Sequence, residues 1–582
     1  MFGLKFIPII ASLASSAWAA PKNTISCSVT SPATTSTTSP LPTVDLGYVI
    51  QRATINETGS YYNFSNIRYG APPTGHLRFA APIPPTTTNR TVNDGQQGRI
   101  CAQAAPYWYE IMEYFVAGSD AATLAYVEEE LTAVEDALTI AGLAAPDPRT
   151  TEDCLFLDVI APKNIFEAKK GAPVLVWIYG GGYTGGDKTS AGNPASLIAR
   201  SQVDGGEGVV FVALNYRNGL FGWLSGSKFN EAGGVSNAGL YDQRLALEWV
   251  RTNIHLFGGD PSRVTVMGES AGAGSIMHQI TAFGGARGPA PFSQAILQSP
   301  GFSPVSGNAQ EDATLEALLT SAQSLISSNI TSVAALRDLS FDELRGLNAI
   351  TVARSYYSQF TYGPSVDGIF VPKLPGVLML EGKFDKNVRA MVAHNSDEGI
   401  IFTSPFLQTE AELVANVKTI FPAASNATID YWAQVAYPPI YDGSYGYTTI
   451  TERAALFISE VSFTCNARYT DLAYGNETYS YYFTVPPGFH GEDVAYTFFN
   501  GDTTTSDDGL PVNATVAETM QRYITNFAMS KTGNPNGKGL PFFPKYQSNA
   551  TVLVLGDTDF GSLTTDPVAN SRCTWLQTAP YA

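Results

Sequence analysis

Short, almost continuous apolar runs recur along this chain and alternate with segments of helical periodicity. Seven such runs occupy residues 174–179, 208–214, 263–267, 295–299, 388–394, 479–485 and 551–556. A run without polar alternation is typical of a strand buried on both faces, and the long segments between the runs have room for crossover helices. The pattern predicts an α/β fold with a large, mostly parallel central sheet flanked by helices.

One of the intervening segments, residues 242–254, has the spacing of a helix that packs on such a sheet. Its sequence, DQRLALEWVRTNI, places the apolar side chains along one broad face, at Leu245, Leu247, Trp249, Val250 and Ile254. A face of this width is typical of a helix that covers a core. We expect this helix between the strands at 208–214 and 263–267.

The segment between Cys101 and Cys154 has a different pattern. Apolar residues recur there at intervals of three and four, at Leu124, Val127, Leu131, Val134 and Leu138. The spacing predicts an amphipathic helix of about four turns within a helical insertion. Simple packing of this helix on the main domain is the favoured interpretation, because apolar stripes usually belong to a core, and a movable substrate lid is the alternative.

The N-terminal residues 1–19 predict a secretory signal peptide. Lys5 precedes an apolar run that ends in Ala17-Trp18-Ala19, a small-x-small pattern, so cleavage is expected after Ala19. No later segment offers about 18 uninterrupted apolar residues, as a membrane span requires. The C-terminal sequence CTWLQTAPYA has neither a lipid-anchor signal nor a KDEL-type retention signal. We expect a secreted, extracellular protein without a stable membrane anchor.

Residues 20–44 predict a leader rich in Ser, Thr and Pro. The stretch SVTSPATTSTTSPLPT, residues 28–43, cannot bury enough apolar surface to offset the entropy of ordering it. No comparable linker or internal repeat follows. Residues 45–582 are therefore expected to form one large domain.

Charge and secretion narrow the possible partners and modifications. The net charge of −18, with a pI near 4.7 and no basic cluster, argues against nucleic acid as a partner. In a secretory compartment, five cysteines suggest two disulfides and one remaining thiol, with the pairing open. The N-x-S/T sequons predict glycosylation at Asn56, Asn63, Asn89, Asn329, Asn426, Asn476, Asn513 and Asn549.

Ser270 lies in a segment with the pattern of a nucleophile elbow. In VTVMGESAGAGS it stands between Gly268 and Gly272, just after the apolar run 263–267 and before a helix start. Such an elbow strains the serine backbone, and only small flanking residues let the neighbouring backbone pass. Ser270 is the candidate nucleophile.

A serine nucleophile needs a base, usually a histidine held by a carboxylate. Of the five histidines, three lie in the wrong context: one precedes the strand pattern and two fall in helical stretches, at His76, His255 and His278. His490 follows the strand at 479–485 in the Pro/Gly loop VPPGFHGED, which suits a catalytic loop. His490 is the favoured base.

The orienting acid should follow an earlier strand than the histidine does. Both Asp397 and Glu398 follow the strand at 388–394, and chain order does not choose between them. A rival assignment makes His394 the base and Asp367 its acid. Glu269 lies beside the nucleophile and is interpreted as a buried structural carboxylate. The alternative is that its negative charge attracts a cationic leaving group.

Acyl transfer also needs donors aimed at the developing oxyanion. The sequence WIYGGGYTGG follows the strand at 174–179, and Gly180, Gly181 and Gly182 can bring backbone N–H groups close to a substrate. Together with the N–H of Ala271, they predict an oxyanion hole.

These motifs resemble those of the type-B carboxylesterase, cholinesterase and fungal lipase family of α/β-hydrolases. The stretch GLYDQRLALEWVRTNIHLFGGDPSRVTVMGESAGAGS is similar to the family signature. TEDCLFLDVIAP, WIYGGGYTGG, ALNYRNGLFGWL, PSVDGIFVP and FHGEDVAYTF look like its other blocks, in the right order. The resemblance covers roughly residues 45–580.

The resemblance implies an α/β-hydrolase fold and a role for individual residues. Ser270 matches the nucleophile, His490 the base, and Glu398, immediately before Gly399, the acid. The oxyanion donors match Gly181, Gly182 and Ala271. No metal and no organic cofactor is implied.

The resemblance also implies disulfides between Cys101 and Cys154 and between Cys465 and Cys573, leaving Cys27 unpaired. The chain departs from the family in three places. It lacks the short disulfide loop that follows the nucleophile domain, and its Cys101 to Cys154 loop is longer than the usual one. The surroundings of Trp108 also differ from those of the cholinesterase tryptophan that holds a quaternary ammonium. A choline ester is therefore disfavoured.

Together these features predict a secreted serine carboxylic ester hydrolase that acts through an acyl-enzyme on a small-molecule or lipid ester. A lipase with interfacial activation is the alternative. A non-catalytic, cholinesterase-like binding module is less favoured, because this chain keeps the serine, the acid and the histidine. The identity of the ester and the oligomeric state stay open.

Overall fold

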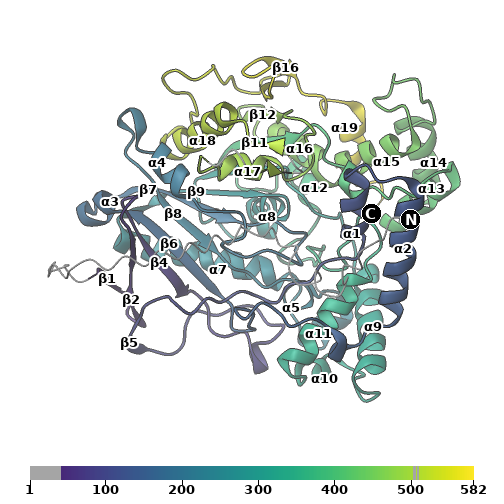
Figure 1. Cartoon of the computed structure of the whole chain (residues 1–582), viewed down its shortest axis with the longest axis horizontal. Coiled ribbons are helices and arrows are strands. Elements are labelled where there is room, and N and C mark those ends of the chain that lie inside the picture. Colours follow the sequence, from purple (N-terminus) through teal and green to yellow (C-terminus); the bar gives the residue numbers. More distant parts are fainter. Residues whose placement is uncertain (1–40, 502–505, 508–509, 582) are drawn as a thin grey trace, which may run out of the picture.

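The protein is described by a computed structural model covering residues 41–501, 506–507 and 510–581 (Figure 1). The predicted signal peptide, Cys27 and the leader as far as residue 40 lie outside the described residues. Strand β1 (Thr43–Asp45) pairs with β2 (Val49–Arg52), and β2 also pairs with β5 (Asn89–Asn93), so a small three-stranded sheet begins the described chain.

All seven predicted strands form, and they are neighbours in one 11-stranded sheet. Their order is β15-β12-β11-β10-β9-β7-β8, and every pair among them is parallel. The strands are β7 (Ala172–Ile178), β8 (Val210–Leu214), β9 (Gly259–Glu269), β10 (Gln294–Gln298), β11 (Arg389–Asn395), β12 (Tyr479–Phe483) and β15 (Thr551–Leu555). The prediction of a mostly parallel central sheet is confirmed.

The other strands of this sheet, which the apolar runs do not predict, pair antiparallel and lie outside the parallel centre. One edge holds β6 (Phe156–Pro162), β4 (Tyr61–Arg68) and β3 (Thr54–Asn56), and the other holds β16 (Leu563–Thr565). β6 is buried throughout, but Asp158 interrupts its apolar run and pairs with Lys188 at 2.9 Å. An internal charge of this kind hides a buried strand from a hydrophobic pattern.

Helices cover both faces of the sheet (Figure 1). On one side, α7 (Ala238–Asn253) and α8 (Ala271–Ile280) pack on each other and on β9, and on the other α4 (Ala195–Arg200) and α18 (Ala514–Met529) pack together. The predicted helix at 242–254 is confirmed as α7, which ends one residue earlier. Most of its predicted face is buried, whereas Leu245 is only partly so.

The predicted insertion folds as α1 (Trp108–Val116) and α2 (Ala121–Asp136), inside the Cys101–Cys154 disulfide. Its amphipathic face meets a small apolar cluster of its own rather than the sheet. Leu124 and Leu131 pack there with Ile111 of α1 and with Ala353, the last residue of α11 (Phe341–Ala353). The helical insertion is therefore confirmed, and its partners are other helices.

Further helices gather with α1 and α2 beyond one end of the sheet, at the right of Figure 1. They include α9 (Asn308–Leu325), α10 (Val333–Arg337), α13 (Glu410–Ile420), α14 (Asn426–Tyr431) and α15 (Ile450–Ser459). The second predicted disulfide, Cys465–Cys573, joins α16 (Cys465–Ala473) to α19 (Ser571–Gln577). Across the described ranges, we find no helix with the length and apolar character needed to cross a bilayer.

Candidate active site

Ser270 occupies a sharp turn between β9 and α8, as the elbow pattern predicts. Its backbone has φ 55° and ψ −125°, in a region that L residues rarely adopt. Strand β9 ends at Glu269 and helix α8 starts at Ala271, so the turn consists of this one residue. The conformation raises the serine side chain out of the strand and into a large cavity.

The two flanking glycines are required by the close approach of β7. A Cβ at Gly272 would lie 2.0 Å from the carbonyl oxygen of Ile178, and one at Gly268 would lie 2.6 Å from the same oxygen. Neither distance is possible without displacing backbone. The glycine spacing in G-x-S-x-G thus follows from the contact between the elbow and the neighbouring strand.

The structure brings Ser270, His490 and Glu398 into one hydrogen-bonded chain. His490 Nε2 lies 2.7 Å from Ser270 Oγ, and His490 Nδ1 lies 2.5 Å from Glu398 Oε2. Glu398 precedes His490 by 92 positions along the chain, and Ser270 precedes it by 220. They meet because β9, β11 and β12 are close neighbours in the sheet and the segments after them meet at the same edge.

Of the two candidate acids, Glu398 is the one that reaches His490. It is completely buried and also accepts hydrogen bonds from Ser299 Oγ at 2.5 Å and the Asn395 N–H at 2.6 Å. Burial alone would raise its pKa, but the His490 charge and these hydrogen bonds outweigh burial and lower the pKa. Asp397, by contrast, is exposed and accepts a hydrogen bond from Ser396 Oγ.

The rival pair of His394 and Asp367 does not come together. His394 Nε2 lies 3.1 Å from Asp566 Oδ1, and Asp367 accepts a hydrogen bond from Asn237 Nδ2. Of the histidines set aside, His278 is buried with its Nδ1 2.8 Å from the Gly274 carbonyl oxygen. His76 and His255 are exposed.

Acidic groups surround the His490 imidazole. Glu269 Oε1 lies 3.3 Å from His490 Nε2, and both side chains are at most 8% exposed. Burial alone would lower the pKa of His490, but Glu269, Glu398 and the more distant Asp493 outweigh burial and raise the pKa. These carboxylates therefore stabilise the imidazolium form of His490 relative to an isolated imidazole.

Sequence reasoning missed several residues that position the histidine. Ser299 stands just after β10, where it ends the run AILQS, and its position at a strand end is the one signal that could have marked it. Phe463 and Phe402 pack on the imidazole, with ring centroids 4.1 and 5.2 Å away. No local pattern marks these two rings, because Phe463, in the helical segment before α16, and Phe402, in the short helix after β11, meet the imidazole only in the folded chain.

The glycine loop after β7 lies against the nucleophile. Gly181 and Gly182 line the same cavity as Ser270 and Ala271, and both have positive φ, 99° and 60°. A Cβ at Gly182 would lie 2.2 Å from the ring of Phe360. In the part of the chain that the structure describes, the N–H groups of Gly181, Gly182 and Ala271 donate no hydrogen bond and are available to a ligand.

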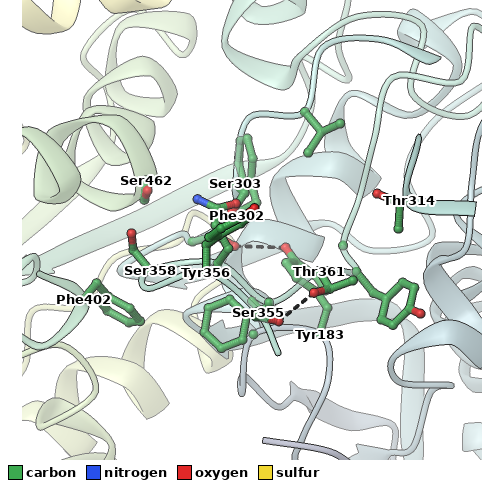
Figure 2. Close-up of a pocket in the computed structure, with 18 of the residues that line it drawn as sticks. Tyr183, Phe302, Ser303, Thr314, Ser355, Tyr356, Ser358, Thr361, Phe402 and Ser462 are labelled. Carbon is green, nitrogen blue, oxygen red and sulfur yellow. Dashed lines mark hydrogen bonds between the residues drawn. The ribbon is translucent and has the colours of Figure 1, made fainter. Parts of the chain in front are cut away.

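The cavity above Ser270 has a volume of about 1200 Å³ and a mixed lining. Aromatic side chains are prominent in its apolar wall, among them Trp108, Tyr109, Phe302, Phe360, Phe402 and Phe463. Hydroxyl groups are frequent as well, including those of Ser303, Thr314, Ser355, Ser358, Thr361 and Ser462 (Figure 2). The insertion contributes to this wall through α1, and Trp108 Nε1 donates a hydrogen bond to the Gln359 carbonyl oxygen at 2.9 Å.

The predicted sequons differ in exposure. Four of the asparagines are exposed: Asn89, Asn329, Asn426 and Asn549. The other four are partly buried: Asn56, Asn63, Asn476 and Asn513. Asn513 in addition caps α18, because its Oδ1 accepts hydrogen bonds from the Thr515 and Val516 N–H groups.

Comparison with known proteins points to one family. The model of the carboxylesterase family matches residues 44–570. The chain belongs to the carboxylesterase family. It is 41% identical to carboxylesterase patB of Penicillium expansum over 558 residues, 93% of this chain and 96% of that protein. Lipase 1 of Geotrichum candidum is 33% identical over 387 residues, 64% of this chain and 66% of the lipase.

Solved structures of esterases share the fold of this family member. EstA of Aspergillus niger superposes with a TM-score of 0.72 at 22% identity, covering 93% of this chain and 99% of EstA. A thermophilic PNB esterase superposes with a TM-score of 0.68 at 25% identity, covering 92% of this chain and 99% of that esterase. The predicted α/β-hydrolase fold is confirmed, and the protein is a carboxylic ester hydrolase.

Proposed function

We propose that this carboxylesterase is a secreted serine hydrolase that cleaves carboxylic esters through an acyl-enzyme on Ser270. The observation that carries the proposal is the buried hydrogen-bonded chain from Ser270 Oγ through His490 to Glu398, which opens into the cavity. A serine, a base within hydrogen-bond reach and a carboxylate behind the base are the parts that activate a hydroxyl nucleophile.

In the first step, Ser270 Oγ attacks the carbonyl carbon of the ester while His490 Nε2 takes the hydroxyl proton. Glu398 holds the Nδ1–H and stabilises the imidazolium that forms. The negative charge moves to the carbonyl oxygen, where the N–H groups of Gly181, Gly182 and Ala271 are the available donors.

The tetrahedral intermediate then collapses. His490 gives its proton to the leaving alcohol, and the acyl group stays on Ser270 as an ester. Water enters with His490 again as the base, attacks the acyl carbon, and releases the carboxylic acid while Ser270 regains its proton.

Secretion is supported by the signal-peptide pattern and by two disulfides in the described chain. Mass spectrometry of protein from the culture medium should find Ala20 at the mature N-terminus. Intact protein that keeps residues 1–19 and stays inside the cell would contradict this part of the proposal.

The esterase assignment is tested with p-nitrophenyl esters from acetate to palmitate, using the wild type and Ser270→Ala side by side. We expect Ser270→Ala to lose about 10⁴-fold or more of kcat/KM with an unchanged unfolding temperature. Diethyl p-nitrophenyl phosphate should modify Ser270 in the wild type, as peptide mass spectrometry can show. Equal turnover by the two proteins would reject the nucleophile assignment.

The same series separates an esterase from a lipase. Preference for short soluble esters supports a carboxylesterase with a static insertion. A sharp rise in rate on long-chain esters once a lipid interface forms would instead support a lipase in which α1 and α2 move.

A further inference from the structure

Glu311 is a carboxylic acid at an apolar position of helix α9. The inward face of this helix consists of Glu311, Leu315, Leu318 and Ala322, so the acid stands where the pattern calls for an apolar residue. Glu311 is 4% exposed, and it lines the same cavity as Ser270. A buried carboxyl group costs free energy unless a partner satisfies it.

The other two acids of α9 have partners, which Glu311 lacks among the described residues. Asp312 accepts hydrogen bonds from Ser227 Oγ and the Lys228 N–H, and Glu316 pairs with the Lys228 ammonium group. Within the described ranges, no donor and no cation lies within bonding distance of the Glu311 carboxyl group. Because Glu311 lines the cavity, its carboxyl oxygens are available to a molecule bound there.

The hydroxyl groups opposite α9 do not supply the missing partner, because they bond to one another. Thr351 Oγ1 lies 3.1 Å from Tyr362 OH, and Ser355 Oγ lies 2.6 Å from Thr361 Oγ1, the pair joined by a dashed line in Figure 2. Thr314, one turn beyond Glu311, donates to the Gln310 carbonyl oxygen at 3.2 Å. These hydroxyl groups therefore have partners of their own, whereas the Glu311 carboxyl group can hydrogen bond to a ligand in the cavity.

The surroundings of the Glu311 carboxyl group favour its neutral, protonated form. Burial, assisted by the neighbouring charge of Asp312, raises the pKa of Glu311 to about 8. A protonated carboxyl group offers one O–H donor and a carbonyl acceptor, which match a neutral hydroxyl or carbonyl group better than a cation.

We propose that Glu311 determines specificity by hydrogen bonding to a neutral hydroxyl or carbonyl oxygen on the ester substrate, away from the scissile bond. The inference rests on the proposed esterase function and narrows it, because an unsubstituted alkyl chain would leave Glu311 buried and unpaired. Sites built to hold a polar group discriminate against the analogue that lacks it for this reason.

The test compares esters that differ by one hydroxyl group. On the acyl side these are p-nitrophenyl esters of ω-hydroxyalkanoic acids and of the plain alkanoic acids, over a series of chain lengths. On the alcohol side they are acetates of diols and of the corresponding simple alcohols. The variants are Glu311→Leu, which removes the hydrogen bonds, and Glu311→Gln, which keeps a donor and an acceptor.

For at least one chain length, we expect the wild type to favour the hydroxylated ester by about tenfold or more in kcat/KM, mostly through KM. Glu311→Leu should abolish or reverse this preference, and Glu311→Gln should retain most of it. Glu316→Leu, on the exposed side of the same helix, is the matched control and should leave the preference unchanged. If Glu311→Leu does not fold, Glu311→Met takes its place.

The outcomes separate the two proposals. Ser270-dependent turnover with equal rates on paired esters, or with a preference that survives Glu311→Leu, overturns the role of Glu311 and leaves the esterase intact. Loss of the preference in the control Glu316→Leu would also overturn the proposed role of Glu311. No Ser270-dependent turnover on any ester would overturn the esterase itself.

Discussion

The Glu269 carboxylate lies 3.3 Å from His490 Nε2, the same nitrogen that faces Ser270 Oγ. The residue before the nucleophile therefore places a negative charge beside the proton that His490 takes up during the reaction. Because Glu269 is buried, solvent screens this charge only weakly from the imidazole.

This contact predicts a shift in the pH dependence of the esterase. Ester cleavage needs neutral His490, so kcat/KM should rise with pH, with its midpoint above the ordinary histidine pKa of about 6.5. Because Glu269 raises the pKa of His490, Glu269→Gln should move this midpoint to lower pH. The plateau rate should fall, since the imidazolium loses a stabilising charge. A pH profile of both proteins with p-nitrophenyl acetate measures these changes; a midpoint that stays in place or rises would contradict the assignment.

The choice of Glu398 as the orienting acid predicts unequal effects of two neighbouring substitutions. Glu398→Gln removes the charge that His490 Nδ1 faces and should lower kcat by about 10⁴-fold. Asp397→Asn, next to it but exposed, is the matched control and should change kcat less than about threefold, as expected of a solvated surface group. Steady-state kinetics with a reporter ester decides the ranking, and a larger loss in Asp397→Asn would reassign the acid.

The tight elbow predicts that Gly272 resists even the smallest substitution. In Gly272→Ala the new methyl group would meet the Ile178 carbonyl oxygen at 2.0 Å, so the elbow or β7 must move. We expect a loss of about 1–3 kcal/mol in the free energy of unfolding and a large loss of activity. Urea unfolding measures the loss in the free energy of unfolding. Gly307→Ala is the control, because its Cβ would meet nothing within 4 Å, and equal destabilisation of the two variants would contradict the argument.

The exposure of the sequons predicts which of them carry glycans. Glycopeptide mapping of secreted protein should find glycans at the exposed asparagines, Asn89, Asn329, Asn426 and Asn549. Asn513 should be unmodified, because its Nδ2 donates to Asp557 at 2.8 Å while its Oδ1 caps α18. A fully occupied Asn513 beside empty exposed sites would show that exposure in the folded chain does not govern modification.

The sequence alone determined the parallel centre of the sheet, the helix α7 and the elbow at Ser270. Each is a local property: a strand covered on both faces has a continuous apolar run, and a turn that passes close to a neighbouring strand needs glycine at fixed positions. The two disulfide pairs followed from resemblance to the family, and the folded chain confirms them. The antiparallel strand β6 escaped prediction because Asp158, buried with Lys188, breaks its apolar run.

Chain order left two adjacent carboxylates open and the family resemblance matched Glu398, but only the tertiary structure shows why one of them faces the histidine and the other does not. Asp397 and Glu398 lie in one turn, but the turn directs one side chain to solvent and the other to His490, 92 positions further along the chain. The role of Ser299, which donates a hydrogen bond to Glu398, is likewise visible only in the folded chain. So is that of Glu311 in the pocket wall, because nothing in the local sequence explains a buried acid on an apolar helix face. Which groups meet across a pocket depends on contacts between distant segments, and residue spacing within each segment does not encode them.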